Sequence, residues 1–93
     1  MIIGIVTATL SLPGSRSLKD KRRVLRSVHD RVLNRMNVSV AEVGAQDRWQ
    51  TAELAFVTVA AESETVQKRV ADLSAMLNVV RDAVLVNLHT EWR

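Results

Sequence analysis

The order of β-rich and helix-periodic segments is the feature that most constrains this fold. Four segments rich in β-branched residues are predicted strands, at residues 2–12, 38–43, 51–61 and 83–92. Two segments with apolar residues every three or four positions are predicted helices, at residues 18–36 and 64–78. This βαββαβ order predicts an α+β, ferredoxin-like sandwich, in which two helices cover one face of a four-stranded antiparallel sheet. With 93 residues, 47% of them hydrophobic, the chain is expected to form a single domain over 1–93.

Both faces of the two central strands contain apolar residues. Ile3 and Ile5 alternate with Val6 and Leu10 in the first strand. The third strand shows the same alternation, with Leu54 and Phe56 on one face and Val57 and Val59 on the other. Whichever set faces the helices, the other leaves a large exposed apolar patch, which is uncommon on a soluble monomer. We therefore expect a homodimer that covers the open face of the sheet.

Single residues predict where the two helices begin and which side chains of the last strand share a face. Ser17, with Asp20 three residues later, is typical of a capping box at the start of the first helix. Ser63 is expected to cap the second helix. Alternate residues of the last strand are expected to share one face, namely Val84, Val86 and Leu88.

A strongly basic segment begins just after the turn at Pro13 and Gly14. Eight basic residues lie between positions 16 and 35, namely Arg16, Lys19, Lys21, Arg22, Arg23, Arg26, Arg31 and Arg35. With two aspartates they give this segment a net charge of +6, although the whole chain carries only +3. Charge concentrated in this way indicates an anionic partner for one face of the protein.

The start of the basic helix is the first candidate site. A helix N-terminus attracts anions, and an arginine there can bind two phosphate oxygens at once. Lys19, Arg22, Arg23 and Arg26 extend positive charge along one outward face of the helix. We expect seven residues to bind the phosphate backbone of RNA: Ser15, Arg16, Ser17, Lys19, Arg22, Arg23 and Arg26. In the alternative interpretation, these cations only solvate an amphipathic helix.

The loop at 44–50 is the second candidate site, because seven residues are more than a plain hairpin needs. Trp49 could stack on an unpaired base, while the amides of Gln46 and Gln50 contact its edge. In the alternative, which is the more common role of a single Trp, Trp49 packs against the core and fixes the loop.

The sequence predicts no catalytic residue, metal site or cofactor. It has no cysteine, no His and carboxylate cluster with ligand spacing, and no nucleophile or phosphate-loop motif. Glu42 and Glu53 are expected to be ordinary exposed carboxylates on neighbouring strands. The N-terminus lacks the basic start of a signal peptide, and no apolar run reaches the roughly 20 residues that span a bilayer. A cytoplasmic protein without a membrane partner is expected.

Two segments carry a resemblance to a known family. Residues 12–25, LPGSRSLKDKRRVL, and residues 37–43 followed by 46–50 resemble the YlxP-like family of small bacterial proteins, with a variable position at Gly44 and Ala45. The resemblance implies a ferredoxin-like fold and a gene that lies among those for translation initiation and ribosome maturation, so the implied partner is ribosomal or pre-ribosomal RNA. It implies no reaction. Asp20 and Arg48 depart from the family, where Glu and an apolar residue are usual.

Two other functions stay open at this point. A dimeric adaptor could dock its basic helix on an acidic protein surface, and the salt dependence of RNA binding distinguishes this case. Acylphosphatases share the predicted fold and bind phosphate in the loop where Arg16 lies. The chain lacks their Gly-Xaa-Val-Gln-Gly-Val-Xaa-Phe-Arg signature, so a non-enzymatic protein is the leading interpretation.

Overall fold

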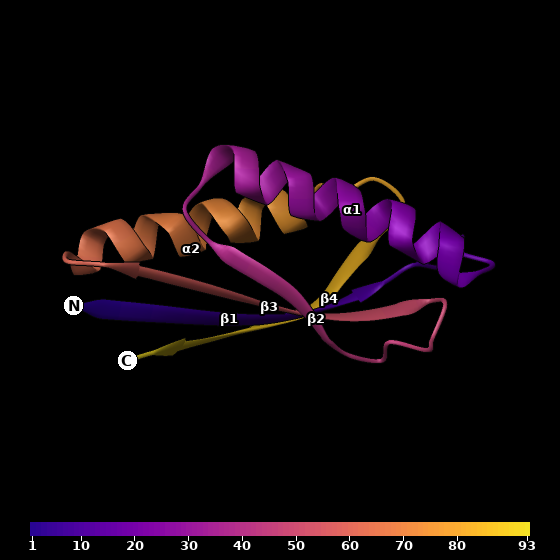
Figure 1. The fold of residues 1–93 in the computed structure, drawn as a ribbon, viewed down its shortest axis with the longest axis horizontal. Helices are drawn as coiled ribbons and strands as arrows, with labels where there is room; N and C mark the ends of the chain where they lie inside the picture. The colour runs from indigo at the N-terminus through magenta and orange to yellow at the C-terminus, as the bar shows by residue number, and fades with distance from the viewer.

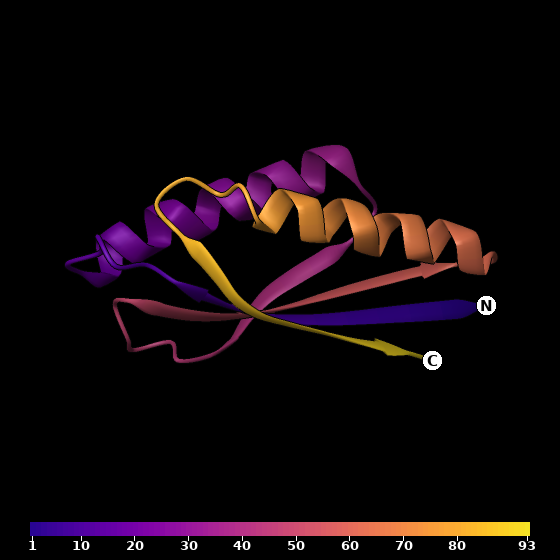
Figure 2. The ribbon, with the colours of Figure 1, turned by 180° about the vertical axis from the view of Figure 1, so that it is seen from behind.

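The computed structural model describes residues 1–93 and contains the six predicted elements in the predicted order (Figure 1). They are β1 (Ile2–Ser11), α1 (Leu18–Arg35), β2 (Ser39–Gly44), β3 (Thr51–Ala60), α2 (Ser63–Leu77) and β4 (Val84–Trp92). The strands form one antiparallel sheet in the order β2-β3-β1-β4, and both helices cover the same face (Figure 2). The ferredoxin-like fold is confirmed.

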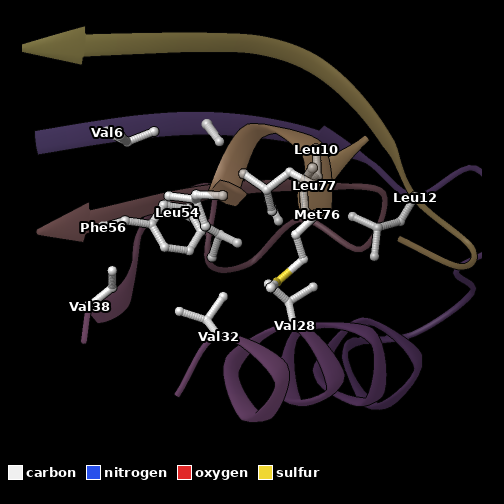
Figure 3. Close-up of a cluster of buried hydrophobic side chains, with 13 residues drawn as sticks. Val6, Leu10, Leu12, Val28, Val32, Val38, Leu54, Phe56, Met76 and Leu77 are labelled. Atoms are coloured by element: carbon white, nitrogen blue, oxygen red, sulfur yellow. The ribbon is translucent and has the colours of Figure 1, made fainter. Parts of the chain in front are cut away.

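The core lies between the sheet and the two helices (Figure 3). β1 and β3 place alternate side chains in it, and Leu10 and Phe56 are almost completely buried. Val28 and Val32 pack onto them from α1, while Leu77 packs from the last turn of α2. The period of two in the strands and of about 3.6 in the helices therefore selects one apolar face from each element.

The two helices begin differently. Ser17 caps α1 as predicted, because its side chain accepts a hydrogen bond from the amide of Asp20. The prediction for α2 is wrong: the N-cap is Glu62, which makes no side-chain cap bond, and Ser63 is the first helical residue. The Ser63 hydroxyl instead accepts a hydrogen bond from the Gln67 side-chain amide, one turn later.

A register shift in β4 corrects the predicted face of that strand. Thr9 pairs with Asn87, but the next residue of β1 pairs with Leu85, so Val86 is an extra residue in the ladder. Such a bulge changes the side-chain alternation from that point on. Val84 and Val86 are consequently exposed, whereas Leu88 packs against the core on the opposite face.

The other face of the sheet is not covered by any helix (Figure 1). Ile3 lies opposite Val59, and Ile5 lies opposite Val57, so four β-branched side chains are neighbours on this open face.

On the covered face, Gly4 lets α2 approach closely, because an added Cβ would lie 2.7 Å from Val66 Cγ1. Neither helix is long and apolar enough to cross a membrane.

Candidate nucleic-acid interface

The turn between β1 and α1 is fixed by hydrogen bonds within the chain. The amide of Ser15 donates to the Leu12 carbonyl, and its buried hydroxyl donates to the Ser17 carbonyl. The Asp20 carboxylate accepts a hydrogen bond of 2.9 Å from the amide of Arg16. The hydroxyls of Ser15 and Ser17 thus already form hydrogen bonds within the protein. The Asp20 carboxylate likewise accepts from the Arg16 amide, which could otherwise have donated to a phosphate.

The predicted cations do lie together on the outside of the molecule. They are Arg16, Lys19, Arg22, Arg23 and Arg26. All five side chains are exposed, and none forms an ion pair within the protein. We call these five residues the basic surface. The four that belong to α1 extend over about 10 Å of its axis, given a rise of about 1.5 Å per residue. The charge of this surface is therefore free to meet an external anion.

Lys21 is the exception among the basic residues of this segment. It is only 2% exposed, and its Nζ lies 2.7 Å from Glu42 Oε2 on β2 and 2.7 Å from the carbonyl of Ala45. The prediction that Glu42 is an ordinary exposed carboxylate is wrong, because its buried Oε2 has no partner except this ammonium. Lys21 lies on the same side of α1 as Leu25, Val28 and Val32, which is the signal in the sequence that could have identified it.

The β2–β3 loop is attached to the β1–α1 turn. Gln50 donates its side-chain amide to the carbonyls of Pro13 and Ser15, both at 3.2 Å. Its own carbonyl accepts a hydrogen bond from the amide of Leu12. Together with the contact between Lys21 and Ala45, these bonds hold residues 45–50 beside the start of α1. The structure thus brings the two predicted sites together, although Gln50 lies there as an anchor.

Trp49 projects from this loop into solvent. Its side chain is 53% exposed, so the interpretation that it packs against the core and fixes the loop is wrong. The anchoring is done instead by Gln50 and by the carbonyl of Ala45, while Gln46 is also exposed. An exposed indole on a fixed loop can offer its flat face to a ligand. We call residues 45–50 together with the basic surface the composite surface.

A groove between α1 and β2 borders the composite surface. Its volume is about 270 Å³, and Arg22, Arg26 and His29 line one side of it. Val40 and Glu42 line the other side, and apolar side chains of the core form its floor. Charged groups therefore surround an apolar hollow that is large enough for a small planar group. The sequence alone did not predict this groove, because its α1 and β2 walls are at least 11 residues apart in the chain and meet only after folding.

These features define a small α+β protein with an uncompensated basic surface. The family model described as a protein of unknown function (DUF503) matches residues 3–90, and the chain belongs to this family. It is 30% identical over 91 residues to the uncharacterized protein YlxP of Bacillus subtilis (strain 168), covering 98% of this chain and 99% of that protein. The resemblance drawn from the two sequence segments is confirmed.

A solved structure supports the fold. The de novo designed protein Foldit4 superposes with a TM-score of 0.53 and covers 100% of this chain and 94% of that chain. Its sequence is only 13% identical, so the likeness concerns the fold alone.

Proposed function

We propose that this protein binds RNA in the cytoplasm through the composite surface. The observation that carries the proposal is the set of five exposed cations without an internal ion pair, beside a fixed loop that presents an indole. Guanidinium and ammonium groups bind phosphate oxygens, and counterions released from RNA supply much of the affinity. No element of the proposal requires a reaction.

The two parts of the composite surface have different roles in this proposal. The basic surface follows the phosphate backbone, which supplies affinity without sequence preference. Trp49 stacks on an unpaired base, so looped or bulged RNA should bind better than a regular duplex. The choice of ribosomal or pre-ribosomal RNA rests on the gene neighbourhood that the family resemblance implies.

The proposal is tested by binding of a structured ribosomal RNA fragment across a salt series. Replacing both Arg22 and Arg26 by Glu should abolish binding, while the thermal midpoint stays nearly unchanged because both side chains are exposed. The matched control replaces Lys68 and Arg81 by Glu, which changes the net charge equally at exposed positions outside the composite surface.

Each lost phosphate contact should lower the slope of log affinity against log salt by about 0.7 to 0.9. Equal weakening by both double variants would show a response to net charge alone and would contradict the proposal. Binding of acidic proteins with no RNA binding at low salt would favour the adaptor function instead.

A further inference from the structure

The open face of the sheet carries an apolar block that no part of the chain covers. The block consists of Ile3 and Ile5 on β1 with their partners Val59 and Val57 on β3. Val57 is 42% exposed and Val59 is 48% exposed, whereas their sequence neighbours Phe56 and Thr58 are buried under the helices. Both helices lie on the far side of the sheet (Figure 2). Four adjacent β-branched side chains on the two central strands therefore contact water in a single copy.

We propose that this block packs against the same block of a second copy, forming a two-fold symmetric homodimer with the two sheets face to face. Sheets of equal twist are complementary in shape and stack about 10 Å apart, with their strands roughly 30° from parallel. A two-fold axis close to Ile5 and Val57 places each block on its own counterpart, as a symmetric interface requires.

The charges of the sheet favour a second copy over nucleic acid as the partner of this face. The four strands contain no Lys or Arg. Glu53 and Glu91 are the carboxylates on the open face, with His89 3.6 Å from Glu91. Phosphate is not attracted to such a surface, whereas an identical apolar block is. Arg93, directly after β4, exchanges backbone hydrogen bonds with Ile3 and lies 3.2 Å from Glu91, so its charge is paired at the edge of this face. The other Lys and Arg residues lie on the helices and in the loops.

The area of the open face suits a small stable dimer. Its central strands have ten residues each, and the edge strands β2 and β4 have six and nine. With a rise of about 3.3 Å per residue and strands about 4.8 Å apart, the face measures roughly 550 Å². Two such faces together bury about 1,100 Å², which exceeds the roughly 1,000 Å² expected of a specific interface. The area therefore suffices for a symmetric dimer.

The dimer also determines how the two composite surfaces are arranged. What this arrangement means for RNA rests on the proposed RNA binding. The helices form the two outer layers, so the basic surfaces face away from each other. With stacked sheets about 10 Å apart and each helix layer about 10 Å further out, the two α1 helices lie on the order of 30 Å apart. One dimer should accordingly hold two RNA segments, one on each side.

Analytical ultracentrifugation of the purified protein without RNA tests the dimer. The wild type should sediment with the mass of two 10.4 kDa chains at micromolar concentration. Val57→Lys should be monomeric, because it places a charge in the centre of the proposed interface. The control Val79→Lys makes the same change at a side chain that is 70% exposed and lies after α2, so it should remain dimeric.

A monomeric wild type would overturn the proposal, and so would a Val57→Lys variant that stays dimeric. If Val57→Lys does not fold by circular dichroism, Val57→Thr is tested instead, because Thr keeps the β-branched shape and replaces one methyl group with a hydroxyl. Val57→Thr should dissociate at a higher concentration than the wild type, and an unchanged dissociation constant would overturn the proposal. Because no RNA is present, failure here leaves the proposed RNA binding unaffected.

Discussion

Replacing Lys21 by Met should destabilise the protein far more than any other exchange of a basic residue in this segment. Met has nearly the volume of Lys but cannot donate to the Ala45 carbonyl or neutralise Glu42. Both contacts are 2.7 Å long, and the Lys21 side chain and Glu42 Oε2 are buried. The variant therefore leaves a buried carboxylate oxygen with no partner at all.

The magnitude follows from these contacts. Removing one partner of a buried ion pair lowers the free energy of unfolding by about 3 to 5 kcal/mol. The Glu42 side chain is 28% exposed, so water can reach part of the abandoned carboxylate and the lower value applies. For a domain of this size, a loss of about 3 kcal/mol lowers the thermal midpoint by roughly 12 to 24 °C.

Urea and thermal unfolding followed by circular dichroism measure this loss. The control Lys19→Met, an exposed neighbour in the same helix, should change the free energy of unfolding by less than about 0.5 kcal/mol. Adding Glu42→Leu to Lys21→Met should restore at least about 1 kcal/mol, since the unpaired carboxylate is then gone. If Lys21→Met were as stable as Lys19→Met, Lys21 would not be a buried anchor.

Two further predictions concern close packing and base stacking. Gly4→Ala should lose about 1 to 3 kcal/mol in urea unfolding, because the new methyl meets Val66, whereas Gly14→Ala, with nothing within 4 Å, should be neutral. An unchanged Gly4→Ala would show that α2 can shift outward freely. Trp49→Ala should retain full stability but weaken binding of a looped RNA by about 1 to 3 kcal/mol in a fluorescence titration. The same loss with a regular duplex would contradict base stacking.

The element order could be predicted because each segment has one dominant periodicity. Thr51–Ala60 alternates buried and exposed side chains through almost its whole length, and α1 begins at Leu18, directly after the predicted cap. The bulge at Val86 could not be predicted, because Val84, Leu85 and Val86 are consecutive apolar residues and their alternation fits either face of the sheet. Only pairing with β1 decides which of them turns toward the helices.

The candidate site was predicted in its composition but not in its construction. Helical spacing places the exposed cations correctly, because solvent is the default for Arg and Lys. That default fails for Lys21, whose partners on β2 and in the following loop are more than 20 residues away in sequence. The exposure of Trp49 likewise depends on Gln50 anchoring the loop, which requires the β1–α1 turn to be folded beside it.

The anchored loop has a consequence for how tightly a ligand can be held. A free loop loses about 1 to 2 kcal/mol of backbone conformational entropy for every residue that is fixed on binding. In residues 45–50 much of this loss has already occurred on folding, through Lys21 at one end and Gln50 at the other. A ligand that meets Trp49 encounters a rigid platform, so a few stacking and phosphate contacts can suffice for stable association.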